Sequence, residues 1–130
     1  MRPGPLFRLL VALGKIPPMA GEIDPAAPRP GPGDGSDLVR LGRYLAMTSC
    51  TECHGLDLQG VDRAGFVTPS LSMAKAYTID HFRTLMEMGV AIGGRELKLM
   101  ALVSRKRFSH FTPTEVEAIH VFLLDEFGDD

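Results

Sequence analysis

The sequence predicts an all-α protein, and three observations support this class. Apolar residues recur at helical spacing in three segments after residue 35. The last of these segments opens with a complete helix-capping signature. No segment shows the alternation of apolar and polar residues that is typical of a half-buried strand. The composition, 45% hydrophobic over 130 residues, suits one compact domain preceded by a tail.

The first 35 residues are predicted to be an arm rather than part of the core. Six of the ten prolines lie in residues 17–32, and proline excludes helix and central strand because it lacks an N–H and has a fixed φ. Residues 6–15 are apolar but include Arg8, and they are too few to span a bilayer, which needs about 20 apolar residues. We therefore expect residues 1–35 to form a short apolar helix and a Pro/Gly-rich linker, and residues 36–130 to form the domain.

The first helix of the domain is predicted to begin near residue 37, where Ser36 or Asp37 can cap it. Its apolar residues at helical spacing are Leu38, Leu41 and Leu45. Gly42 lies inside this helix, where glycine costs about 1 kcal/mol relative to alanine. A glycine at this position indicates that another stretch of backbone approaches closely.

Two further helices are predicted downstream. Residues 78–88 have one apolar face, and Gly89 ends the segment. The apolar face consists of Ile79, Phe82, Leu85 and Met86. The final helix has Thr112 as its N-cap, Pro113 in its first position and Glu115 completing a capping box. Between these two helices we expect a long loop.

Cys50, Cys53 and His54 form the strongest chemical motif, Cys-x-x-Cys-His, which is typical of c-type haem attachment. Two thiols about one helical turn apart can form thioether bonds with the two vinyl groups on one edge of haem, and the adjoining imidazole then reaches the iron. An incidental pairing and a thioredoxin-like redox pair are the alternatives, but the second belongs near a βαβ pattern, which is absent. A zinc site would need two more Cys or His at comparable spacing. The remaining histidines are scattered singly, as on a surface or helix face: His81, His110 and His120.

A methionine is the expected ligand on the other face of the haem, and Met73 and Met100 are the two that are predicted to lie in loops. Met73 follows His54 by only 19 residues, a stretch that is needed to wrap the proximal side. Met100 follows it by 46 residues with one predicted helix between, so the chain can cross to the other face. We favour Met100 and keep Met73 as the alternative.

From about Ser36 to its end, the chain resembles a class I cytochrome c domain. More narrowly, it resembles the small monohaem cytochromes associated with bacterial periplasmic dehydrogenases and respiratory chains. Gly42 stands eight residues before Cys50, as in the family's first helix, where it packs against the last helix. The segment Pro69-Ser70-Leu71 resembles the family's Pro-x-Leu, in which the proline carbonyl accepts a hydrogen bond from the proximal histidine.

The resemblance implies a cytochrome c fold, with three core helices and loops wrapped around one covalently bound haem c. His54 and Met100 would be the iron ligands, and Tyr77 or Arg95 could hydrogen-bond a haem propionate. It implies an electron carrier rather than an enzyme, located in the periplasm because thioether attachment in bacteria occurs outside the cytoplasm. Its partners would be redox proteins such as a dehydrogenase, another cytochrome or an oxidase, and an upstream segment could tether it to the membrane.

Two other functions remain open. A haem enzyme or a gas sensor would need a displaceable distal ligand, and a docking module would act through the proline-rich arm. The net charge of −2 gives no reason to expect nucleic acid as a partner. Residues 95–107 nevertheless carry a local charge of +4, which either steers an acidic redox partner or keeps a loop solvated. The charged residues of this segment are Arg95, Glu96, Lys98, Arg105, Lys106 and Arg107.

Overall fold

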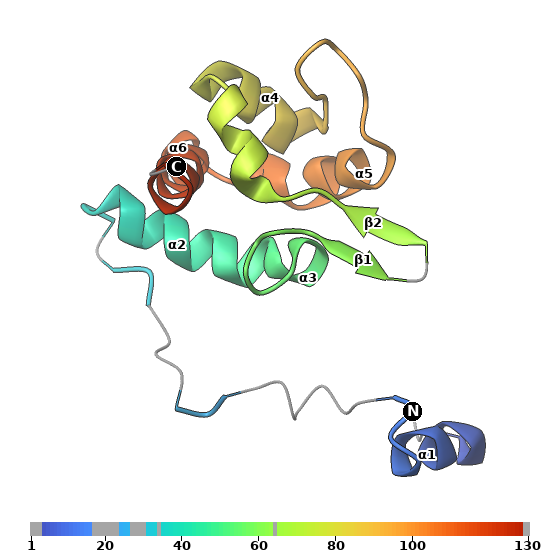
Figure 1. Cartoon of the computed structure of the whole chain (residues 1–130). Helices are drawn as coiled ribbons and strands as arrows, with labels where there is room; N and C mark the ends of the chain where they lie inside the picture. The colour runs from blue at the N-terminus through green and yellow to red at the C-terminus, as the bar shows by residue number, and fades with distance from the viewer. Residues whose placement is uncertain (1–3, 17–23, 27–30, 34, 64, 129–130) are drawn as a thin grey trace.

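The computed structural model describes residues 4–16, 24–26, 31–33, 35–63 and 65–128. These residues are mostly helical, with one two-stranded antiparallel sheet (Figure 1). In chain order the elements are α1 (Pro5–Ala12), α2 (Leu38–Ser49), α3 (Thr51–His54), β1 (Val61–Arg63), β2 (Phe66–Thr68), the 3₁₀ helix η2 (Leu71–Ala76), α4 (Ile79–Met88), α5 (Lys98–Lys106), the 3₁₀ helix η3 (Phe108–His110) and α6 (Pro113–Glu126).

The predicted starts of α2 and α6 and the predicted end of α4 are confirmed. The Asp37 carboxylate caps α2 by accepting a hydrogen bond from the Arg40 backbone N–H at 3.0 Å. Gly89 ends α4 in the left-handed conformation, at φ 70°. At the start of α6, the Thr112 backbone N–H donates to the Glu115 carboxylate at 2.7 Å, and the reciprocal bond completes the capping box. Local capping chemistry therefore sets these helix boundaries.

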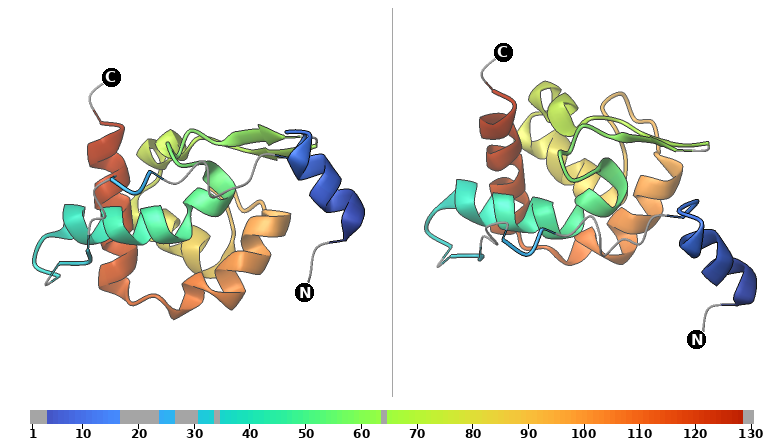
Figure 2. Two further views of the ribbon diagram at one scale, coloured as in Figure 1. Left: turned by 90° about the horizontal axis from the view of Figure 1, so that it is seen from below. Right: turned by 60° about the horizontal axis from the view of Figure 1, so that its bottom comes forward.

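The core is built where α2 crosses α6, the first and last helices of the segment after residue 35 (Figures 1 and 2). Gly42 is the contact point, because a Cβ there would collide with the Ala118 carbonyl and with Cβ of Phe122. The close backbone approach predicted from this glycine is confirmed. The buried apolar residues around the crossing include Leu45, Ala46, Phe82, Leu85, Met86, Val116, Ile119, Phe122 and Leu123.

The prediction of an all-α cytochrome c fold with three core helices is wrong. Residues 61–63 and 66–68 form an antiparallel hairpin in which Arg63 pairs with Phe66 and Val61 pairs with Thr68. Gly65 lies in the two-residue turn with φ 89°, a conformation that favours glycine. Each strand has only three residues, which is too short for an alternating pattern to show in the sequence.

The loop expected before the final helix is also corrected, because residues 98–106 form α5. Ala101 and Ser104 are the buried residues of this helix. The Ser104 hydroxyl donates to the Leu85 carbonyl of α4 at 3.0 Å, and Gly89 approaches Ala101 so closely that a Cβ on this glycine would collide with it. Helix α5 is thus packed onto α4, and Met100 lies in a helix rather than in a loop.

Helix α1 is the short apolar helix that was expected near the N-terminus. No residue of α1 is buried, and Figure 1 shows it apart from the other elements. Much of the predicted proline-rich linker lies outside the described residues. Among the residues that the structure describes, no helix has the length and apolar character needed to cross a membrane. The division of the chain at residue 35 stays a prediction.

Candidate functional site

Cys50 and Cys53 lie on one helical turn, at the junction between α2 and α3. Cys50 ends α2 and precedes α3, and its backbone N–H donates to the Ala46 carbonyl at 2.8 Å. Its own carbonyl accepts from the N–H groups of Cys53, at 3.2 Å, and His54, at 2.9 Å. These hydrogen bonds therefore hold Cys50, Cys53 and His54 within one helical turn, as the spacing of the motif predicts.

His54 is oriented by the hydrogen bond that was expected from Pro69. Nδ1 of His54 lies 2.9 Å from the carbonyl oxygen of Pro69. Because a carbonyl can only accept, Nδ1 carries the hydrogen and donates, and in the neutral imidazole this leaves Nε2 as the nitrogen with a free lone pair. A metal-binding histidine is typically held in this way, with one ring nitrogen on a backbone carbonyl and the other on the metal.

The β1–β2 hairpin holds this segment in place. The Thr68 hydroxyl donates to the Cys53 carbonyl at 2.6 Å and accepts from the Val61 backbone N–H at 3.0 Å. The Gly60 N–H donates to the His54 carbonyl at 2.8 Å. The residue before β1 and the last residue of β2 therefore both form hydrogen bonds with the backbone of the Cys-x-x-Cys-His motif. Sequence reasoning missed Thr68, and its position directly before Pro69 was the one local signal of its role.

The Cys50 side chain is buried in the hydrophobic core, whereas Cys53 is half-buried. Burial, with a smaller contribution from Cys53, raises the pKa of the Cys50 thiol to about 12. A thiol of this kind is almost entirely protonated near neutral pH and is a weak nucleophile. This property opposes the thioredoxin-like alternative, in which the first cysteine of the pair must ionise readily.

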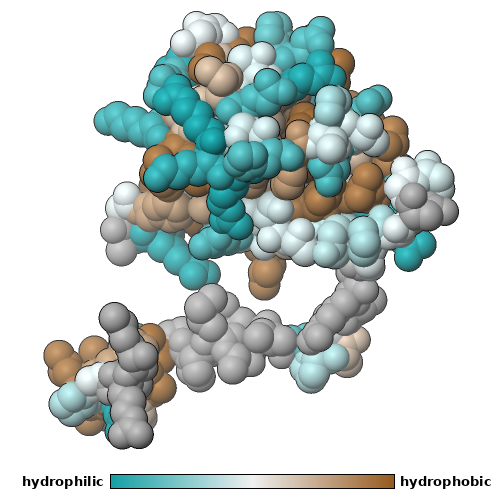
Figure 3. Space-filling model, turned by 180° about the vertical axis from the view of Figure 1, so that it is seen from behind, coloured by the Kyte–Doolittle hydropathy of each residue, from teal (hydrophilic) through white to brown (hydrophobic). Residues whose placement is uncertain are grey.

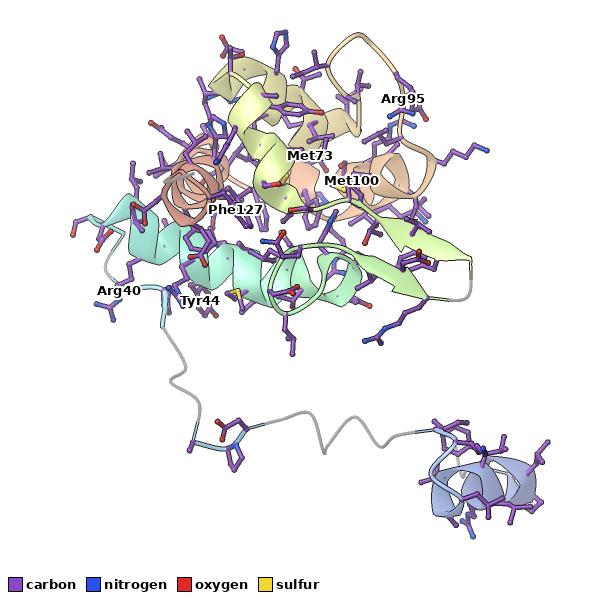
Figure 4. All side chains as sticks on the ribbon, in the orientation of Figure 1. Arg40, Tyr44, Met73, Arg95, Met100 and Phe127 are labelled. Carbon is purple, nitrogen blue, oxygen red and sulfur yellow. The ribbon has the colours of Figure 1, made fainter. Side chains whose placement is uncertain are left out.

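The two methionine candidates differ in position and burial. Met100 lies in α5, is half-buried and packs against the core cluster. Met73 lies in η2 and is 38% exposed. Figure 4 shows both side chains in the part of the molecule between α2 and α4. A thioether ligand of iron is shielded from water in a low-dielectric setting, and Met100 meets that requirement better than Met73 does.

The two residues considered for propionate binding lie in different settings. Tyr77 is buried, its ring makes an edge-to-face contact with Phe82 at 6.4 Å, and its carbonyl accepts from Nε2 of His120 at 3.0 Å. Arg95 is exposed on the connection between α4 and α5 (Figure 4). No hydrogen bond among the described residues joins these two side chains to each other or to the motif. His120 is buried in α6, although its isolated position in the sequence had indicated a surface or helix face.

An ion pair with Glu52, outside the segment, offsets part of the charge of +4 predicted for residues 95–107, whereas the pair with Glu96 is already counted in that charge. Arg105 pairs with Glu96 at 2.9 Å, and Arg107 pairs with Glu52 at 3.5 Å. Within the part of the chain that the structure describes, the cations of this segment without an ion pair are Arg95, Lys98 and Lys106. The segment keeps a positive surface, but a smaller one than the sequence alone indicated.

The residues of the motif fit a covalently held haem. Haem brings four ring nitrogens for its own iron, so the protein needs to supply two thiols and the axial ligands. Cys50 and Cys53 are one turn apart, and the free lone pair of His54 Nε2 is suited to iron. In the described residues, no cluster of three or more His, Cys, Asp or Glu side chains could hold a metal ion directly.

Comparison of the chain with protein-family models, with curated proteins and with solved structures found no match.

Proposed function

We propose that the chain is an electron carrier that holds one haem c through Cys50 and Cys53 and exchanges single electrons with redox proteins. The hydrogen bond from His54 Nδ1 to the Pro69 carbonyl is the observation that carries the proposal. It fixes one tautomer and one ring orientation, so Nε2 is already prepared to act as an axial ligand. When bound, haem supplies a one-electron couple at its iron.

Each residue of the proposed site has a separate task. The two thiols fix the cofactor covalently, and the Thr68 and Gly60 hydrogen bonds hold the cysteine-bearing backbone in place. His54 and Met100 would hold the haem iron. A methionine opposite a histidine raises the reduction potential, because the soft thioether favours the ferrous state. With protein side chains on both faces, no coordination position is left for a substrate, which favours a carrier over a haem enzyme.

The partners follow from this chemistry. A carrier needs a donor and an acceptor, and we infer redox proteins such as a dehydrogenase, another cytochrome or an oxidase. Because thioether attachment in bacteria takes place outside the cytoplasm, the periplasm is the inferred location.

The direct test is expression of the full chain in a host that attaches haem, followed by a pyridine haemochrome spectrum and an intact mass. We expect one haem that stays with the polypeptide after denaturation. Replacing both cysteines with alanine should abolish this attachment, whereas Met73→Ala should leave it intact. A colourless wild-type protein, with the mass of the polypeptide alone, would rule out the proposed function.

The distal ligand is tested with the matched variants Met100→Ala and Met73→Ala. Since Met100 is half-buried and Met73 is exposed, we expect only Met100→Ala to lose the far-red absorption of the ferric methionine-ligated haem. The same variant should gain carbon monoxide binding in the ferrous state at neutral pH. Carbon monoxide binding by the wild-type protein would instead favour the haem enzyme or gas sensor.

A further inference from the structure

Helix α1 carries an apolar surface that is exposed. The exposed fractions are 68% for Leu6, 48% for Phe7, 54% for Leu9 and 62% for Leu13. Figure 3 shows α1 as a mainly hydrophobic body at the lower left. An apolar surface of this kind marks a site of interaction, because soluble proteins rarely expose neighbouring large apolar side chains without a partner.

The apolar residues of α1 are grouped on one face. With about 100° between successive residues of a helix, Leu9 and Leu10 fall on the same side, and Leu6 lies between them. Arg8 falls on the opposite side of the helix. The helix is therefore amphipathic, with a broad apolar face and a cationic residue behind it.

The charge of this segment has one sign only. Residues 1–21 contain Arg2, Arg8 and Lys15 and no aspartate or glutamate. An apolar face accompanied only by cations is complementary to a surface that is apolar inside and anionic outside. That combination is the surface of a bilayer containing anionic lipids.

We propose that α1 lies in the plane of an anionic lipid bilayer and tethers the rest of the chain to it through the proline-rich segment. The apolar face enters the boundary between headgroups and acyl chains, and Arg8 lies among the lipid phosphates. Its 8 residues extend about 12 Å, against about 30 Å for the hydrocarbon core, so this helix lies on the membrane. The proposal is independent of the proposed haem function.

The test is co-sedimentation of the full chain with vesicles of phosphatidylcholine alone, or of phosphatidylcholine containing about one third phosphatidylglycerol. We expect binding to the anionic vesicles, reduced at least about tenfold by Leu9→Asp because a carboxylate then enters the apolar face. Arg8→Glu should also weaken binding by about tenfold or more. The matched control is Leu102→Asp, since Leu102 is 51% exposed on α5 and Leu9 is 54% exposed. This control should bind as the wild type does.

Three outcomes would overturn the proposal. The first is that Leu9→Asp and the wild type bind the vesicles equally. The second is that the wild type does not bind anionic vesicles. The third is that the wild type is a dimer in solution and the Leu9→Asp substitution makes it monomeric. The last would assign the apolar face to a second copy of the chain. Because no residue of α1 is buried, Leu9→Asp should leave thermal unfolding unchanged, so a loss of binding cannot be assigned to misfolding.

A fluorescence measurement locates the contact. The chain contains no tryptophan, so Phe7→Trp introduces a single reporter on α1. We expect its emission to shift to shorter wavelength when anionic vesicles are added, because the indole moves into a less polar setting. An unchanged emission from vesicle-bound protein would show that another part of the chain makes the contact, and would overturn the proposal.

Discussion

The absence of a Cβ atom at Gly42 allows α2 and α6 to pack closely. It lies in α2 at the crossing with α6, where a Cβ would meet the Ala118 carbonyl. A carbonyl that belongs to a helix cannot move aside without disturbing its own hydrogen bond. The cost of glycine inside a helix is therefore offset by the close approach of the two helices.

Replacing Gly42 with alanine should destabilise the protein by about 2–3 kcal/mol, because the added methyl group forces the two helices apart. The measurement is urea unfolding of Gly42→Ala beside the wild type. Gly31→Ala is the control, since a Cβ at Gly31 meets nothing within 4 Å. Equal stability of Gly42→Ala and the wild type would contradict the packing described for this crossing.

Cys50 should be alkylated more slowly in the folded, haem-free chain than in the unfolded chain. Burial raises the pKa of Cys50 to about 12 from 9.0, so far less thiolate is present in the folded protein at about pH 8. Allowing for the higher reactivity of a more basic thiolate, we expect alkylation of Cys50 to be roughly fortyfold slower than in the urea-unfolded chain. Peptide mapping after timed iodoacetamide treatment measures both sites. Similar rates for folded and unfolded Cys50 would show that its thiol is accessible.

Among the elements, those with strong local chemistry were predictable and those that depend on context were not. The caps of α2, α4 and α6 involve residues within three or four positions of each other, so they can be read from the chain. The β1–β2 hairpin has three-residue strands, and pairing rather than periodicity defines them. Helix α5 was taken for a loop by analogy with the family, although most of its residues are good helix formers.

The features of the candidate site can likewise be separated into those that were predicted from the sequence and those that were missed. The motif and the contact between His54 and Pro69 were predicted, the first from spacing and the second from the resemblance. Thr68 was missed because its partner, the Cys53 carbonyl, is 15 residues away and is brought close only by the hairpin. The setting of Tyr77 was also missed, because its burial depends on contacts with Phe82 and His120 from two other helices.

The packing of α5 on α4 is tested by a pair of glycine variants. Gly89 and Gly93 both have positive φ, at 70° and 86°, so alanine is strained at either position. Only at Gly89 would the new Cβ collide with Ala101, whereas nothing lies within 4 Å at Gly93. We expect Gly89→Ala to cost about 2 kcal/mol more than Gly93→Ala in the free energy of unfolding. Equal costs would show that α5 does not lie against α4 in solution.

Across the whole molecule, the net charge of −2 and the positive surface of α5 have opposite signs. Lys98 and Lys106 are at the two ends of the helix that carries Met100, and neither forms an ion pair within the described residues. Unpaired cations raise the local concentration of anions near the residues they surround. This surface would therefore affect the rate at which charged reactants reach the proposed haem.

The double variant Lys98→Glu/Lys106→Glu should be reduced by ascorbate about threefold more slowly than the wild type at low ionic strength. The difference should disappear at high salt, because ions screen the interaction. Stopped-flow reduction measures the rates, and an uncharged hydroquinone is the control reductant. Equal slowing with both reductants, or rates that do not vary with salt, would contradict electrostatic steering.

The crossing of α2 and α6 also has a consequence for how the chain folds. The two helices are separated by 63 residues, between Ser49 and Pro113, so their contact requires closure of a long loop. During synthesis, the surface of α2 around Gly42 has no packing partner until α6 has left the ribosome. A nascent chain that stops before Pro113 would therefore leave the surface of α2 around Gly42 without the helix that covers it.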